Sequence, residues 1–113
     1  MCIRDRVYYL LGRYREAIDY YEKALAISEQ LESKPSMSQD LGNLALCHLG
    51  LGEVSEALER FDQALSLARE AGLEKETADW LKGKGDAYHD TGRHSEGLEL
   101  YRQALEAYES AGL

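Results

Sequence analysis

Apolar residues recur at steps of three and four along most of this chain, and glycines interrupt the spacing. One such stretch contains Ala57, Leu58, Phe61, Ala64, Leu65 and Ala68. Steps of three and four bring side chains to one face of an α-helix, whereas a half-buried strand alternates apolar and polar residues. The spacing therefore predicts an all-α chain of six helices, at residues 2–11, 14–31, 35–50, 54–71, 75–90 and 94–111.

Residues with turn and capping chemistry lie between these segments. Gly52 comes directly after the helical spacing of residues 41–51 ends, and a glycine there suits a left-handed helix cap. Pro35 suits the first turn of the third helix, because that turn has no backbone donor to lose. Ser36 with Gln39 predicts a capping box at the same place.

The helices belong to a unit that recurs every 40 residues. Gly12, Gly52 and Gly92 open its copies, which begin Gly12-Arg-Tyr-Arg-Glu-Ala-Ile, Gly52-Glu-Val-Ser-Glu-Ala-Leu and Gly92-Arg-His-Ser-Glu-Gly-Leu. A fixed period in this range is typical of stacked helical repeats, in which each unit packs only on its neighbours. The chain holds nearly three units, at about residues 1–33, 34–73 and 74–113.

Small residues mark where the helices of one unit would cross. The first set follows each turn by five residues, where bulk would push the helices apart, and the second set faces a large aromatic residue, an arrangement that lets helices approach closely. The small positions are Ala17, Ala57 and Gly97, then Ala24, Ala64 and Ala104, and the aromatic residues are Tyr21, Phe61 and Tyr101.

The glycine turns, small crossings and second-helix aromatics resemble the tetratricopeptide repeat (TPR) family. The usual period there is about 34 residues, and the 40-residue period is similar to LGN-type, kinesin-light-chain-like and bacterial tandem-repeat proteins. The resemblance implies an α-solenoid, a right-handed superhelical stack of antiparallel helix pairs with about three repeats. It also implies a concave groove, lined by the first helix of each repeat, that binds a protein or peptide.

On that resemblance, eight side chains are expected to line the groove: Tyr9, Gln39, Asn43, Leu46, Asp79, Lys82, Asp86 and His89. Asn43 is the strongest candidate, because an amide donates and accepts at once and can hold a peptide backbone. The alternative is that Asn43 bonds its own neighbours or water. Its counterpart in the next repeat is Gly83, so a continuous asparagine ladder is broken. A carboxylate clamp around Lys82 is disfavoured, because Asp86 stands where an asparagine would be needed.

The charge balance disfavours two classes of partner. The net charge is −8, whereas nucleic acid and anionic membrane surfaces attract basic proteins. No apolar run approaches the roughly 18 residues of a membrane-spanning helix. Cys2 and Cys47 are too few for a disulfide framework, which favours a reducing compartment and a cytoplasmic location.

The sequence offers little support for catalysis or cofactors. It contains no phosphate-binding glycine loop, HExxH or CxxC motif, so we expect no enzyme activity and no cofactor. Asp86, His89, Asp90 and His94 carry metal-ligand atoms, but an exposed polar face explains them better, and no metal is expected. Trp80 has two open interpretations, a binding anchor or a packing residue. Packing positions are expected for Cys47 and His48.

These observations predict a non-catalytic scaffold that binds proteins or peptides. The alternative is a regulatory or self-associating segment of a larger signalling or transcription-regulatory protein. The last helix lacks a polar cap, so Leu98, Tyr101 and Leu105 are expected to be exposed and to permit end-to-end association. Residues 1–6 do not resemble a repeat start and are expected to be non-native, with residues 7–113 forming one array from a longer protein.

Overall fold

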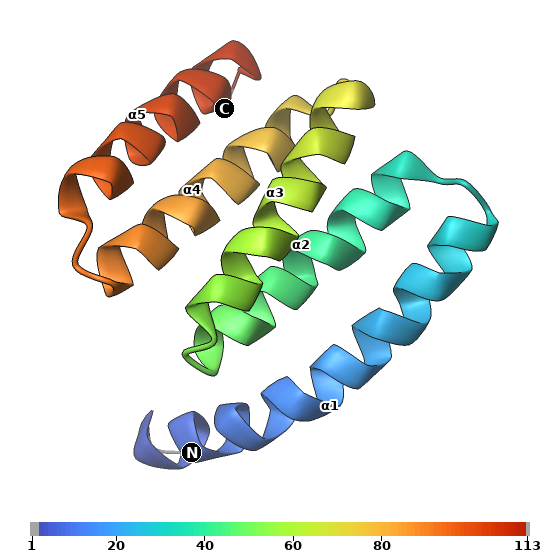
Figure 1. The fold of residues 1–113 in the computed structure, drawn as a ribbon, viewed down its shortest axis with the longest axis vertical. Coiled ribbons are helices and arrows are strands. Elements are labelled where there is room, and N and C mark those ends of the chain that lie inside the picture. The colour runs from blue at the N-terminus through green and yellow to red at the C-terminus, as the bar shows by residue number, and fades with distance from the viewer. Residues whose placement is uncertain (1–2, 113) are drawn as a thin grey trace.

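In a computed structural model the chain folds into five α-helices, and the structure describes residues 3–112, with side chains from residue 13 onward (Figure 1). The helices are α1 (Ile3–Gln30), α2 (Lys34–Gly50), α3 (Val54–Glu70), α4 (Glu74–Asp90) and α5 (His94–Ser110). No strand occurs within these residues. The predicted all-α class is confirmed, and four of the predicted helices agree with α2 to α5 within one residue at each end.

The prediction of six helices is wrong in the first repeat. A turn was expected at Gly12, but α1 continues through this glycine as one helix. The turn at Gly52 follows α2, whose buried face gives the returning helix α3 a surface to pack on. The residues before Gly12 form only a short segment, and in it Arg4 occupies the place that the buried Leu44 holds in the next repeat. Each residue that extends the helix adds one backbone hydrogen bond. A turn at Gly12 would give up several of these bonds, and the short segment before it offers too little packing to compensate.

The later turns share one backbone geometry. Gly52, Gly72 and Gly92 have φ angles of +79°, +70° and +81°, as a left-handed cap requires. The residue after each glycine donates its N–H to a carbonyl five residues earlier, as from Glu53 to His48 at 2.8 Å. The first turn places Glu32 at φ +53° instead, where a side chain is strained.

The start of α2 differs from the predicted capping box. Ser33 is the N-cap, and its side chain accepts a hydrogen bond from the backbone N–H of Ser36 at 3.4 Å. Ser36 therefore lies inside the first turn, so the box predicted on Ser36 and Gln39 is wrong by three positions. Pro35 lies in the first turn as predicted.

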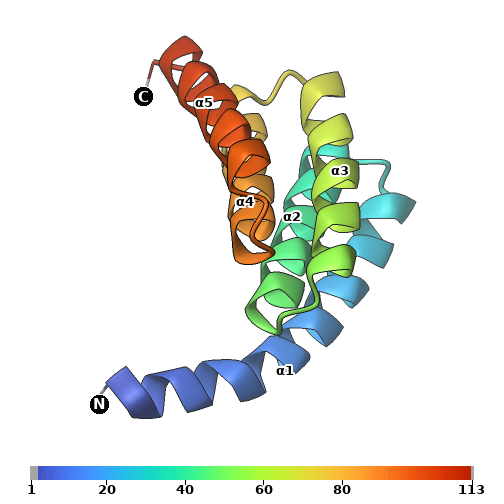
Figure 2. The same cartoon turned by 60° about the vertical axis from the view of Figure 1, so that its left-hand side comes forward.

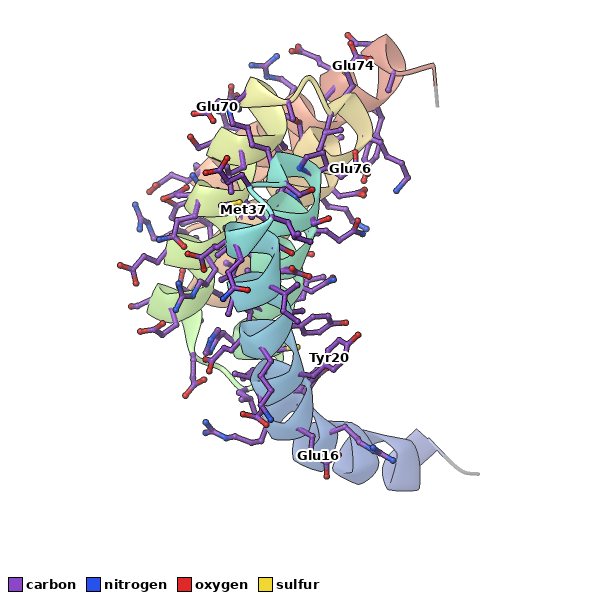
Figure 3. All side chains as sticks on the ribbon, turned by 90° about the vertical axis from the view of Figure 1, so that its right-hand side faces the viewer. Glu16, Tyr20, Met37, Glu70, Glu74 and Glu76 are labelled. Atoms are coloured by element: carbon purple, nitrogen blue, oxygen red, sulfur yellow. The ribbon has the colours of Figure 1, made fainter. Side chains whose placement is uncertain are left out.

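The helices stack in chain order, each packed on the next, and α2 also contacts α4. At one end of the stack α5 lies beside α4, and α1 lies at the other end (Figure 2). Exposed acidic side chains project outward from the stack, among them Glu16, Glu70 and Glu74 (Figure 3). This is the solenoid arrangement that the repeat predicts.

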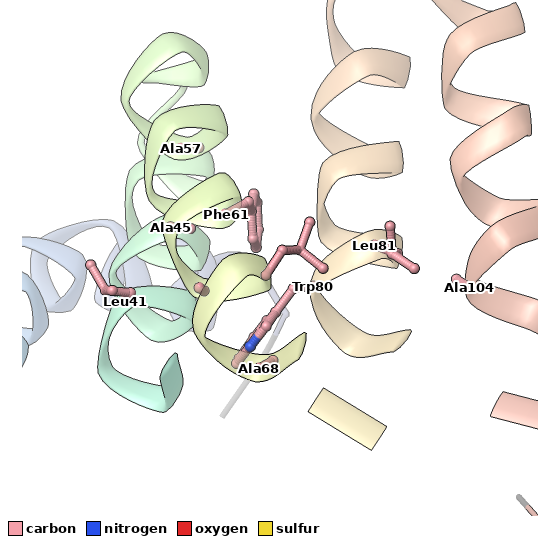
Figure 4. Close-up of a cluster of buried hydrophobic side chains, with 10 residues drawn as sticks. Leu41, Ala45, Ala57, Phe61, Ala68, Trp80, Leu81 and Ala104 are labelled. Carbon is pink, nitrogen blue, oxygen red and sulfur yellow. The ribbon is translucent and has the colours of Figure 1, made fainter. Parts of the chain in front are cut away.

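The core lies between the helices and follows the predicted pairing of small and large residues (Figure 4). Ala57, Phe61 and Ala64 are fully buried, and Ala104 is 3% exposed. At Gly97 an added Cβ atom would lie 3.0 Å from the carbonyl oxygen of Gly85, so bulk there would separate α4 from α5. The small residues set the helix spacing.

Trp80 is a packing residue, which decides between its two interpretations. It is 5% exposed and lies beside Phe61, with ring centroids 6.3 Å apart. Its indole N–H donates to Ser38 Oγ at 3.1 Å, and Ser38 donates to the carbonyl of Ala64 at 2.9 Å. These two hydrogen bonds join α4 to α2 and α2 to α3, and they leave the buried indole N–H and the Ser38 hydroxyl with partners.

Candidate functional site

A hollow of about 340 Å³ lies between α2 and α4, at the place where the groove was expected. Side chains from three helices surround it. They are Gln39, Asn43 and Leu46 from α2, Asp79, Trp80, Lys82 and Asp86 from α4, and Tyr108 from α5, and the backbone of Gly83 completes the lining. This volume is within the range of roughly 300–1,000 Å³ that ligand sites occupy.

Six of the eight residues expected in the groove line this hollow. His89 does not line it, because its ring turns to the α4–α5 connection, where Nδ1 lies 2.8 Å from Nδ1 of His94. The side chain of Tyr9 lies outside the described residues. The structure thus brings together the residues from the second and third repeats.

Two tyrosines from α5 orient the carboxylates of the hollow. Tyr108 donates its hydroxyl to Asp79 Oδ1, and Tyr101 donates to Asp86 Oδ1. These hydrogen bonds, together with burial, raise the pKa of both tyrosines to about 12. Both phenols therefore stay protonated at neutral pH and remain donors. Asp79 also accepts from Lys75 at 2.9 Å through its other oxygen.

Sequence reasoning missed Tyr108 as a groove residue, although a signal was present. Tyr101 and Tyr108 are seven residues apart on α5, and Asp79 and Asp86 are seven apart on α4. Two turns of helix separate each pair, so packed antiparallel helices can match both at once. The equal spacing can be read from the sequence, but the register between α4 and α5 cannot.

The remaining polar side chains of the hollow are Gln39, Asn43 and Lys82. Within the described part of the chain, they make no side-chain hydrogen bond or ion pair. The alternative in which Asn43 bonds its own neighbours is thus not observed there. Leu46 is 45% exposed and adds apolar surface. The hollow combines amides, both charges and one apolar side chain.

Packing explains why the asparagine ladder is broken at Gly83. A Cβ atom at Gly83 would lie 2.4 Å from Cζ of Phe61, and one at Gly42 would lie 2.2 Å from Cζ2 of Trp80. Both aromatic rings occupy the space of a side chain. Neither position has room for a side chain unless its aromatic neighbour moves.

The other residues singled out by chemistry have structural surroundings. Cys47 is 7% exposed, and burial raises the pKa of its thiol. His48 Nδ1 lies 2.9 Å from Glu53 Oε1, and this hydrogen bond lowers the pKa of the Glu53 carboxyl. Among the side chains described, from residue 13 to residue 112, no three metal-ligating groups gather into a cluster. None of the helices described is long and apolar enough to cross a membrane.

Comparison with known proteins identifies the family. A family model described as tetratricopeptide repeat matches residues 6–70 and again residues 41–110. The crystal structure of BtubC (BKLC) from P. vanneervenii is similar with a TM-score of 0.77 at 22% identity, over 88% of this chain and 41% of that chain. At this identity the likeness concerns the fold, and the present chain spans about two fifths of that protein. No curated protein matches the sequence. The predicted resemblance is confirmed, and the chain belongs to the tetratricopeptide repeat family.

Proposed function

We propose that this chain is a non-catalytic scaffold that binds a protein or peptide in the groove between α2 and α4. Repeats of this family generally mediate protein–protein interaction. The observation that carries the proposal is the hollow itself, where Gln39, Asn43 and Lys82 have unused hydrogen-bonding capacity. A cytoplasmic location and membership of a larger regulatory protein remain predictions.

The hollow suits an extended segment better than a compact ligand. An extended chain presents a backbone donor or acceptor about every 3.3 Å, and the amides of Gln39 and Asn43 can bond both kinds. Asp79 and Asp86 are held in place by tyrosines, so they bind without first losing side-chain freedom. Leu46 can cover an apolar side chain of the partner.

A selection from a random peptide library tests this function. Peptides retained by the wild-type chain would be measured by fluorescence anisotropy against Asn43→Ala and against Gln30→Ala. Gln30 is an exposed amide at the end of α1 and lies outside the hollow, so it serves as the matched control. We expect Asn43→Ala to weaken binding about tenfold, the loss of one or two hydrogen bonds, at unchanged helicity. Equal affinity of both variants would contradict the groove as the site.

The exposed face of α5 supports a second function, self-association. Leu98 is 66% exposed and Leu105 is 59% exposed, as the sequence predicted, whereas Tyr101 is half-buried against Asp86. The residue equivalent to Leu105 in the preceding repeat is Leu65, which is 4% exposed in the core shared with α4. A second copy that covers Leu98 and Leu105 would bury the same kind of surface. Sedimentation velocity over a range of concentrations tests this, and a constant monomer mass would count against it.

A further inference from the structure

The groove between α2 and α4 contains two charges of opposite sign that no described side chain compensates. They belong to Lys82 and Asp86, which both line the hollow. Lys82 forms no ion pair among the described residues. Asp86 accepts a hydrogen bond from the hydroxyl of Tyr101 and pairs with no cation there. The hydroxyl orients the carboxylate but leaves its charge in place.

The other carboxylate of the hollow is compensated, so α4 permits such an ion pair. Asp79 accepts a hydrogen bond from Lys75 Nζ at 2.9 Å, four residues earlier on the same helix. Lys82 also stands four residues before Asp86, yet these two described side chains form no ion pair. An ion pair across an exposed helix turn is weak in water. A partner that approaches Lys82 or Asp86 therefore has little intramolecular attraction to overcome.

The loss of water on binding determines which charges a partner needs. A segment that lies in the hollow removes water from Lys82 and Asp86. A charge that loses water without gaining an opposite charge is destabilised. An apolar segment would therefore bind weakly, even with backbone hydrogen bonds to Gln39 and Asn43. A well-matched segment places an acidic group at Lys82 and a basic group at Asp86.

The spacing of the two charges fits alternate residues of an extended chain. Lys82 and Asp86 are four residues apart, which is about 6 Å along a helix. Side chains at positions i and i+2 of an extended chain lie on one side, about 6.7 Å apart. Adjacent side chains of such a chain point to opposite sides, so only one of two neighbouring charges can face the groove.

We propose that the groove binds an extended segment in which one acidic and one basic side chain stand two positions apart. The acidic side chain lies at Lys82 and the basic one at Asp86. This inference rests on the proposed peptide-binding function and adds the charge pattern of the partner. Arginine suits the basic position, because one Asp86 oxygen accepts from Tyr101 and the other has no partner among the described residues. The net charge of −8 attracts basic segments in general, so the acidic side chain is the distinctive part.

Three random peptide libraries test the spacing. Each library has one glutamate and one arginine fixed at its centre, separated by one residue in either order or placed side by side. Retention on the immobilised wild-type chain is the readout. We expect one of the two spaced libraries to be retained about fivefold more than the adjacent library, the contribution of one ion pair at a partly exposed site. Which order is preferred reports the direction of the bound chain.

Double-mutant cycles with a retained peptide test the pairing of each charge. Lys82→Gln should weaken the peptide about fivefold, and should have no further effect on the same peptide with glutamine in place of its glutamate. Asp86→Asn should behave in the same way toward the arginine, and it keeps an acceptor for Tyr101. Lys23→Gln and Asp19→Asn are the matched controls, because these residues pair with each other on α1 outside the hollow.

Failure of this charge pattern and failure of peptide binding give different results. Peptides that bind and are weakened by Asn43→Ala, but are retained equally from all three libraries, would overturn the charge pattern and leave the groove as a peptide site. Additive effects in both cycles, or equal effects of the groove variants and the α1 controls, would assign the attraction to net charge and also overturn it. Retention from none of the libraries would contradict the peptide-binding function as well.

Discussion

Gly42→Ala tests whether the indole of Trp80 is held as rigidly as its contacts indicate. An added Cβ atom would lie 2.2 Å, 2.3 Å and 2.4 Å from three atoms of the six-membered indole ring. The ring cannot turn aside without losing the hydrogen bond to Ser38 and its contact with Phe61. The substitution must therefore displace α2 from α4 or force Trp80 from its position.

Two effects of opposite sign decide how much Gly42→Ala changes the free energy of unfolding. Alanine in a helix interior is favoured over glycine by about 1 kcal/mol, so at an open site the variant would be more stable. Overpacking a buried contact costs about 1–3 kcal/mol, and a ring held on two sides belongs at the upper end. The net loss is about 2 kcal/mol, which lowers the melting temperature of a chain of this size by about 8 °C.

Urea unfolding followed by tryptophan fluorescence measures this loss, because Trp80 is the only tryptophan. Circular dichroism melts of Gly42→Ala, Trp80→Leu and the double variant complete a double-mutant cycle. Leucine lacks the three clashing atoms, so Gly42→Ala should cost little or even stabilise in the Trp80→Leu background. A higher melting temperature for Gly42→Ala alone would refute the reasoning, as would equal costs in both backgrounds.

Three further predictions concern single interactions. Glu32→Gly should raise the free energy of unfolding by about 1 kcal/mol, because glycine adopts the left-handed conformation without strain, and urea titration checks this. Ser38→Ala should cost about 1–3 kcal/mol in the same assay, since it leaves the Trp80 N–H buried without an acceptor. Tyr101, whose pKa is raised from 10 to about 12, stabilises the fold fully below pH 10 and loses that contribution as the pH rises toward 12. Ultraviolet titration should show Asp86→Asn bringing the pKa of Tyr101 back toward 10, and an unchanged pKa would contradict the bond.

Much of the architecture was readable from the sequence because it depends on neighbouring residues. The apolar spacing predicted α2 to α5, and the glycines predicted the turns, since a left-handed backbone at Gly52 or Gly92 is a local property. The resemblance to the tetratricopeptide repeat, and not the spacing, led us to expect Asn43 and Lys82 in one groove, and both line the same hollow. Equivalent residues in stacked repeats occupy equivalent places, which is why the family pattern could be applied to this chain.

Tertiary structure decided what depends on partners distant in the chain. Gly12 does not turn the chain, because the short segment before it carries Arg4 in place of the buried Leu44, whereas Gly52 follows a helix with a full buried face. The sequence alone determined that Trp80 and Tyr108 lie on helices, but not what each contacts. Only the packing of the helices buried the indole beside Phe61 and joined Tyr108 to Asp79. Helix periodicity is set by local backbone hydrogen bonds, whereas a side chain acquires its partner only when separate helices pack in one register.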